Sequence, residues 1–235
     1  MSSSTKADMV IDWCSHEAAS FAVEHWHYSR TMPGSKLAKL GVWEQGRFIG
    51  ALIFGLGATG NLGAPYGLST FQVVELQRVA LAQHRAPVSR IVMVAVRIVR
   101  RRFKGLRLVL SYADPSYGHH GGIYQAMGWI YTGGTMSSRA LRLPDGQLLH
   151  SRAWSATGYK KHYGKIQRVF SSKDGVVVRL PSKHRYIYPL DDQIRAVVEE
   201  RRLPYPRQKD SSEPSAHRAE EGGAAPTLAL QERKA

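Results

Sequence analysis

Three short stretches of the sequence concentrate side chains that can bind a metal ion or move a proton. They are residues 25–29 (His-Trp-His-Tyr-Ser), residues 75–81 (Glu-Leu-Gln-Arg-Val-Ala-Leu) and residues 111–126 (Ser-Tyr-Ala-Asp-Pro-Ser-Tyr-Gly-His-His-Gly-Gly-Ile-Tyr-Gln-Ala). An imidazole and a carboxylate suit iron, and a phenolate adds a hard anionic oxygen. His27, Tyr28 and Asp114 could supply one of each. The stretches therefore indicate a metal site, an acid–base site, or both.

The same residues also have purely structural interpretations. A His-Tyr pair at a helix more often packs, with its imidazole simply hydrogen-bonded. Asp114 precedes a proline and could form a turn, although it ends a predicted strand, where α/β sheets place ligands. Tyr124 could belong to the core. Arg78 could pair with Glu75, but strand alternation puts residues three apart on opposite faces.

The elements that would position these residues alternate between strands and helices. The pattern predicts a helix over 15–25, a hairpin over 40–55, a strand over 71–81, a helix over 87–103, a strand over 106–114, a short helix over 123–127, a strand over 129–133 and a hairpin over 141–150. The hairpins are expected to turn at Gln45-Gly46 and Asp145-Gly146. This order predicts an α/β fold with a mixed sheet.

The length of 235 residues suits one domain with an appendage. We expect a single domain over residues 1–206. Residues 207–235 contain Ser-Ser-Glu-Pro-Ser and Gly-Gly-Ala-Ala-Pro, and their acidic and basic residues balance. Such a segment buries too little apolar surface to offset its ordering entropy, so it is expected to be a flexible, disordered tail.

The charge of the chain points to a polyanionic partner. The formal net charge is +15 and the sequence pI is about 10.1. The excess gathers in two regions, one between Glu75 and Asp114 and one from Arg139 to Arg185, where Trp154, Tyr159 and Tyr163 lie among the basic residues. Double-stranded DNA is the first candidate partner. The expected contacts are Arg100, Arg101, Arg102, Lys160 and Lys161.

Several classes of protein are excluded by the sequence. The single cysteine, Cys14, cannot form an internal disulfide, which fits a reducing cytosol. The apolar stretches, such as residues 51–58 and 91–96, are shorter than the roughly 20 residues that a membrane span needs. Residues 1–5 lack the pattern of a signal peptide. A cytoplasmic protein is therefore expected, in the host cell if the chain is phage-encoded.

One segment resembles the closing part of the GNAT-type acyltransferase superfamily. After the strand that ends at Asp114, residues 123–133 place Tyr124 on a short helix and Trp129 after Gly128, at the start of the next strand. Residues 73–103 fall where that superfamily binds the pyrophosphate of acyl-CoA at a helix N-terminus. The resemblance implies acetyl-CoA as a donor, with contacts from Arg85, Ser89 and Arg90. The loop over 82–89 departs from the superfamily because it lacks the usual glycines.

Together with Pro65-Tyr-Gly-Leu and Lys183-His-Arg-Tyr-Ile-Tyr-Pro-Leu, the three reactive stretches resemble the Mom family of phage DNA-modification proteins. The resemblance covers most of residues 25–190. It implies an iron-dependent transferase that adds a methylcarbamoyl group to the exocyclic amine of adenine and so protects phage DNA from host restriction. It places iron ligands at His27, Tyr28 and Asp114, and further catalytic residues at Tyr124 and Arg78.

The chemistry of adenine calls for such groups independently. The lone pair of the exocyclic nitrogen is delocalised into the ring, so an enzyme must activate the donor or remove a proton as the bond forms. The base must also be extruded from the duplex and held. Two other interpretations stay open: an acetyl-CoA-dependent N-acetyltransferase of another substrate, and a non-catalytic basic DNA-binding protein.

Overall fold

The computed structural model describes residues 9–34, 36–57, 60–151, 153–162 and 164–207. The chain divides into two compact units, residues 1–205 and 206–235, and the following description concerns the first. The tail that the sequence predicts to be flexible lies, from residue 208 onward, outside the described residues. No helix in the described ranges is long and apolar enough to cross a bilayer.

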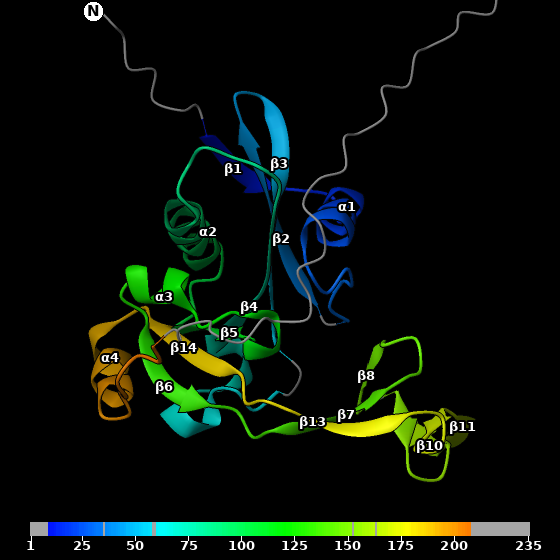
Figure 1. The fold of residues 1–235 in the computed structure, drawn as a ribbon. Coiled ribbons are helices and arrows are strands. Elements are labelled where there is room, and N and C mark those ends of the chain that lie inside the picture. Colours follow the sequence, from blue (N-terminus) through cyan, green and yellow to red (C-terminus); the bar gives the residue numbers. More distant parts are fainter. Residues whose placement is uncertain (1–8, 35, 58–59, 152, 163, 208–235) are drawn as a thin grey trace, which may run out of the picture. The chain divides into compact units, whose positions relative to one another are not determined.

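A seven-stranded sheet forms the centre of the first unit (Figure 1). Its strands, in spatial order, are β1 (Met9–Trp13), β2 (Leu37–Glu44), β3 (Arg47–Gly55), β4 (Val73–Leu81), β5 (Leu108–Ala113), β14 (His184–Pro189) and β6 (Ile130–Gly134). Strands β4 and β5 pair in parallel, and the other neighbours pair antiparallel. The mixed α/β sheet predicted from the sequence is confirmed.

Helices cover both faces of this sheet. On one face lie α2 (Val88–Arg102) and α3 (Gly122–Ala126), and on the other lie α1 (His16–Trp26) and α4 (Asp192–Glu199). Figure 1 shows α1 and α2 on opposite sides of β2 and β3. Alternation along β3 explains the arrangement, because Leu52 and Phe54 face α2 whereas Ala51 and Ile53 face α1.

Local signals in the sequence set several of these elements. The Ser15 hydroxyl accepts a hydrogen bond from the Ala18 N–H and begins α1, as the sequence predicts. Gln45 and Gly46 both have positive φ, 53° and 75°, which suits the tight turn between β2 and β3. Three short 3-10 helices, η1 (Ala64–Tyr66), η2 (Thr70–Gln72) and η3 (Pro115–Tyr117), complete the loops.

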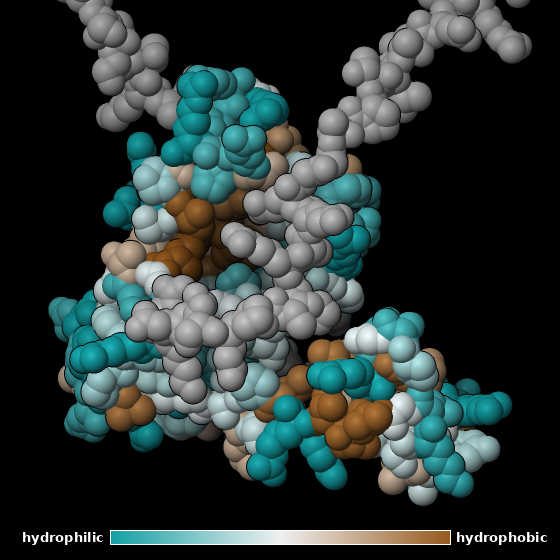
Figure 2. All heavy atoms as spheres, in the orientation of Figure 1, coloured by the Kyte–Doolittle hydropathy of each residue, from teal (hydrophilic) through white to brown (hydrophobic). Residues whose placement is uncertain are grey.

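The segment between β6 and β14 holds seven further strands, which we call the inserted strands. They are β7 (Ser138–Arg142), β8 (Leu148–His150), β9 (Trp154–Ser155), β10 (Tyr159–His162), β11 (Lys165–Arg168), β12 (Phe170–Ser171) and β13 (Val176–Leu180). They form three small sheets, β13-β7-β8, β10-β11 and β12-β9. The hairpin predicted over 141–150 is β7 and β8. Several large apolar side chains are exposed here, and Figure 2 shows hydrophobic and hydrophilic side chains intermixed over this region.

Candidate functional site

A cavity opens where β4 and β5 separate. The parallel pairing of the two strands ends at Leu76 and Ser111, although both strands continue beyond these residues. The resulting gap holds a cavity of about 530 Å³, lined by the end of α1, by β4, by β5 and by the segment that leads into α3. The strand ends therefore bring the three reactive stretches of the sequence to one place, and all of His27, Tyr28, Arg78, Asp114 and Tyr124 line the cavity.

Tyr124 enters the cavity from α3 with its hydroxyl held in place. The Ser111 hydroxyl donates to the Leu76 carbonyl at 2.7 Å, so it accepts the 2.7 Å hydrogen bond that it shares with Tyr124. Burial raises the pKa of Tyr124 to about 12, although the Ser111 contact lowers it somewhat. The tyrosine therefore keeps its proton at neutral pH. The tight approach of the chain to Tyr186 requires Gly121, where a Cβ would lie 2.1 Å from the Tyr186 ring and φ is +87°.

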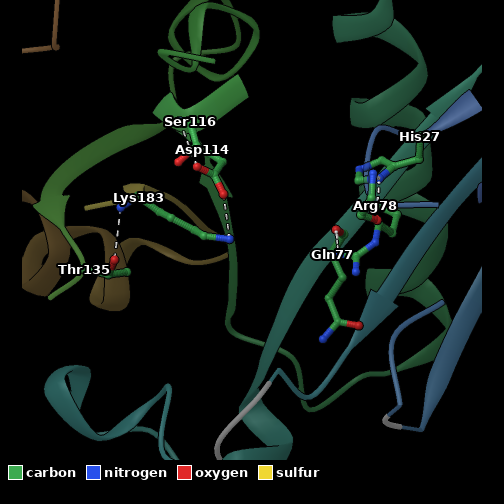
Figure 3. A network of polar contacts seen from close by, with 8 residues as sticks. His27, Gln77, Arg78, Asp114, Ser116, Thr135 and Lys183 are labelled. Atoms are coloured by element: carbon green, nitrogen blue, oxygen red, sulfur yellow. Dashed lines mark hydrogen bonds and ion pairs between the residues drawn. The ribbon is translucent and has the colours of Figure 1, made fainter. Parts of the chain in front are cut away.

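Asp114 is a buried carboxylate with two partners (Figure 3). Its Oδ2 forms an ion pair with Lys183 Nζ at 2.9 Å, and its Oδ1 accepts the Ser116 N–H at 3.0 Å. Burial by itself would raise the pKa of Asp114, but the Lys183 ammonium and the Ser116 contacts outweigh it and hold the pKa below its usual value. Asp114 is thus ionised at neutral pH and able to accept a proton.

Arg78 lies on the far side of the cavity from this ion pair. Strand β4 carries a bulge opposite Ile53 and Phe54, which pair with Arg78 and Leu76 and leave Gln77 as the extra residue. The Arg78 guanidinium donates to the carbonyls of Gln77 and Thr31, as Figure 3 shows for Gln77. No ion pair joins Arg78 to Glu75 among the described residues.

His27 and Tyr28 follow the last turn of α1. The Ser29 N–H donates to His27 Nδ1 at 3.1 Å, so the neutral ring carries its proton on Nε2. Burial, followed by the charge of Arg78, lowers the pKa of His27 to about 4. Burial of the hydroxyl, followed by the carboxylate of Asp114, raises the pKa of Tyr28 to about 12. Both side chains are therefore neutral at neutral pH.

These contacts do not fit the iron site that the resemblance implies. Asp114 already binds Lys183, the Nδ1 lone pair of His27 is used by Ser29, and the charge of Arg78 acts on both His27 and Tyr28. Within the described ranges, no three histidine, cysteine or acidic side chains are grouped as a metal site would require. The three predicted ligands share a cavity but do not form a ligand set, and no step is derived through a metal.

The expected acyl-CoA contacts lie elsewhere. Arg85, Ser89 and Arg90 flank the start of α2, whose N-cap is Pro87, and none of them lines the cavity. The Glu44 carboxylate accepts the N–H groups of Arg85 and Ala86, both at 2.9 Å. These hydrogen bonds, first that of Arg85, hold the pKa of Glu44 below its usual value. Two backbone N–H groups of this loop are therefore already hydrogen-bonded to a carboxylate, which would also repel a pyrophosphate.

The expected DNA contacts occupy two separate elements. Arg100, Arg101 and Arg102 end α2, where cations also favour the helix dipole. Lys160 and Lys161 lie on β10, and the Lys160 ammonium donates to the Ser151 carbonyl. None of the five lines the cavity. They therefore mark candidate binding surfaces outside the cavity.

Sequence reasoning did not single out three residues of this site. Lys183, Ser111 and Gln77 each contact or line the cavity, and the Gln77 Oε1 is buried without a hydrogen-bond partner in the described part of the chain. Lys183 comes into place because His184 pairs with Ala113, the residue before Asp114. No local pattern in the sequence indicates this pairing. For Ser111, its position three residues before Asp114 on a buried strand was the available signal.

Comparison with solved structures finds acetyltransferases. The chain is similar to a putative acetyltransferase of Acinetobacter baylyi ADP1 (10% identity, 80% of this chain and 94% of that chain, TM-score 0.43). It is also similar to a Bacillus subtilis acetyltransferase in complex with CoA (10% identity, 79% and 100%, TM-score 0.43). In the order predicted for the closing segment, β5, α3 and β6 follow one another along the chain. These likenesses say nothing about the residues of the cavity.

The amino-acid sequence matches known proteins over most of its length. A protein named Methylcarbamoylase mom, from Escherichia phage Mu, is 28% identical over 188 residues, which cover 77% of this chain and 76% of the relative. The model of the Mom protein family matches residues 8–207. That range includes the whole seven-stranded sheet, every residue that lines the cavity and the inserted strands. The chain therefore belongs to the Mom protein family.

Proposed function

We propose that this chain modifies adenine in phage DNA, adding a methylcarbamoyl group to the exocyclic amine and so protecting the DNA from host restriction enzymes. The observation that carries the proposal is the family match over residues 8–207, together with the phage Mu relative named as a methylcarbamoylase. The cavity supports it, because an ionised carboxylate, two protonated tyrosines and an arginine line one space of about 530 Å³.

Each charged or protonated group has a task that its surroundings favour. The exocyclic nitrogen must lose a proton as its bond to the donor carbonyl forms, and Asp114 is ionised and positioned at a strand end to take it. Arg78 brings a positive charge to the cavity, where a carbonyl oxygen of the donor would become negative. Tyr124 keeps its proton, so it can orient the donor or protonate the donor atom whose bond to the transferred carbonyl breaks.

DNA would be held outside the cavity. The basic residues of α2 and β10 supply contacts to phosphates, which position a duplex without reading its sequence. An adenine extruded from the duplex could then reach the cavity. The resemblance suggests an acyl-CoA donor, although Glu44 occupies the loop where its pyrophosphate is expected. Acetyl-CoA itself would give an acetylated adenine, because an acetyl group lacks the nitrogen of a methylcarbamoyl group. Direct transfer therefore requires a thioester that already carries the methylcarbamoyl group, whose carbonyl–sulfur bond breaks and whose thiol leaves as the bond to adenine forms. Iron has no part in the steps described above.

Mass spectrometry of nucleosides from the DNA of cells that express the chain tests the proposal. The expected result is an adenine nucleoside whose mass has increased by that of a methylcarbamoyl group. An acetyl group in its place would favour the N-acetyltransferase interpretation. Unmodified DNA, with iron and acetyl-CoA both supplied, would return the chain to the class of basic DNA-binding proteins.

A further inference from the structure

Four aromatic rings lie in contact beside the cavity, in pairs that are tilted by 31° to 36°, and we call this group the stack. The His27 and Tyr28 rings have centroids 4.2 Å apart, and those of Tyr28 and Tyr117 are also 4.2 Å apart. His119 lies 5.4 Å from Tyr28. The first two rings follow α1 and the other two belong to the segment around η3, so residues distant in the sequence meet here.

Core packing does not explain this stack. Tyr28 is 44% exposed and Tyr117 is 51% exposed, although tyrosine rings stabilise a fold mainly when they are buried. By contrast Tyr124, only a few residues along the chain from Tyr117, is 8% exposed and packs on Trp129 and Tyr186. Rings that are exposed beside a cavity are typical of binding surfaces.

The stack is joined through the backbone to the residue that carries the carboxylate of the cavity. Asp114 is the N-cap of η3, and its carbonyl accepts the Tyr117 N–H at 3.1 Å, so the two residues belong to one turn. Gly118 and His119, which follow Tyr117, line the cavity. A flat ligand on the exposed Tyr117 ring would therefore contact the turn that begins at Asp114.

We propose that Tyr28 and Tyr117 form a platform on which the extruded base of a DNA duplex stacks before it reacts. This inference rests on the proposed function, and it gives Tyr28 a role that requires neither a phenolate nor a metal. Every base has a π face, and stacking on an aromatic side chain offsets part of the energy lost when the base leaves the duplex.

A purine ring could also come from acyl-CoA, which contains adenine. The placement of the stack favours DNA, because Tyr28 and His119 line the cavity whereas the expected acyl-CoA contacts Arg85, Ser89 and Arg90 do not. The strong positive charge of the chain favours the same partner. The test below separates the two sources.

The test compares two DNA duplexes of the same sequence that contain one 2-aminopurine. In the first the 2-aminopurine pairs with thymine, and in the second it lies opposite an abasic site, so that its extrusion costs little. Affinity is measured for the wild type, Tyr117→Ala, Tyr117→Phe and Phe71→Ala. The last variant is the matched control, because Phe71 is a 78% exposed aromatic residue outside the cavity lining. Thermal melts check that each variant is folded.

The wild type is expected to prefer the abasic duplex by at least about fivefold, the low end for stacking of one base on an aromatic ring. Tyr117→Ala should lose the preference but keep its affinity for the paired duplex. Tyr117→Phe and Phe71→Ala should retain the preference. A wild type without preference, or a Tyr117→Ala variant that keeps it, would overturn the platform.

Two further measurements separate this inference from others. If Tyr117→Ala weakened binding of acetyl-CoA alone and kept the DNA preference, the ring would serve the cofactor, and the DNA platform would be wrong. Nucleoside mass spectrometry on the same proteins tests the proposed function independently. A preference that depends on Tyr117 in a protein that modifies no adenine would refute the proposed function and support the platform. If Tyr117→Ala kept both wild-type levels of modified adenine and the preference for the abasic duplex, the proposed function would be supported and the platform would be refuted.

Discussion

The cavity and the inserted strands differ in almost every physical respect. The cavity is built on the ends of long, buried strands, and its functional groups are fixed by hydrogen bonds such as those of Ser111 with Tyr124 and Leu76. The inserted strands are short, form sheets of only two or three strands, and expose residues such as Tyr159 and Ile166. Lys160 and Lys161 lie on the same hairpin.

This difference indicates a division of labour. A group that transfers a proton must be held to within a fraction of an ångström, which a packed sheet provides. Contacts to a DNA backbone tolerate much looser placement, because they depend on charge and on long side chains. We therefore expect substitutions in the cavity to remove chemistry while leaving DNA binding, and substitutions in the inserted strands to do the opposite.

The largest effect is expected from the two groups that the proposal gives proton-transfer roles. Asp114→Asn removes a charge with little change of shape, and Tyr124→Phe removes only a hydroxyl. Each should lower the amount of modified adenine by at least about tenfold, the low end for loss of a general acid or base. Both variants should bind DNA like the wild type in a filter or fluorescence assay. Modified adenine at wild-type levels in both would reduce these residues to structural roles.

A smaller effect, on DNA binding alone, is expected from substitution of Lys160 and Lys161 in the hairpin of β10 and β11. The double variant Lys160→Ala, Lys161→Ala loses two phosphate contacts. The negative slope of log affinity against log salt concentration should therefore become shallower by about 1.8. Replacing Arg100, Arg101 and Arg102 by alanine tests the end of α2 in the same assay. Activity at low salt should be largely kept by the hairpin variant. An unchanged salt slope in both variants would place the DNA on another surface.

The loop before α2 allows a test that is independent of DNA. Glu44→Gln replaces an oxygen that accepts the Arg85 or Ala86 N–H with an amide that cannot, so the free energy of unfolding should decrease. If acyl-CoA binds at this loop, removal of the negative charge should also strengthen acetyl-CoA binding, measured by calorimetry. Reduced stability with unchanged acetyl-CoA affinity would show that the carboxylate has a structural role and that the donor binds elsewhere.

The sequence predicted the parts of the fold that depend on local patterns. Alternation along 71–81 and the cap at Ser15 were sufficient to place β4 and α1. Helix α4 was not predicted, although a local signal exists: Asp191 is its N-cap and accepts the Ile194 N–H at 3.0 Å. The small strands β9 to β12 have two to four residues each, too few for a periodic pattern.

The candidate site was predictable to a similar extent. Residue type and the position of a strand end were enough to select Asp114, whereas Tyr124 was selected by the family resemblance; both line the cavity. The hydrogen bonds that each residue makes were not predictable, because they depend on how distant segments pair. The predicted iron ligands show the consequence, since His27 and Asp114 are the right types of residue but already bind Ser29 and Lys183.

The smallest effect is expected from substitution of Lys183, which contacts Asp114 in the cavity and follows the inserted strands. It follows the inserted strands, its carbonyl accepts the Thr135 N–H at the point where they leave the sheet, and its ammonium binds Asp114. In Lys183→Met the pKa of Asp114 should rise, because burial would no longer be opposed by the ammonium. The acidic limb of the pH–activity profile should therefore move to higher pH, with activity near the optimum changed least.

The same substitution has a consequence for stability whose sign follows from the pKa. Because Asp114 has a pKa below its unfolded value, its ionised form stabilises the fold above the unfolded pKa, and this contribution is lost as the pH falls through the folded pKa. Lys183→Met should therefore be less stable than the wild type at neutral pH, and the difference in free energy of unfolding should shrink on acidification. Urea denaturation at several pH values measures it. An unmoved acidic limb, together with a stability difference that does not depend on pH, would show that Lys183 packs against the root of the inserted strands without controlling the charge of Asp114.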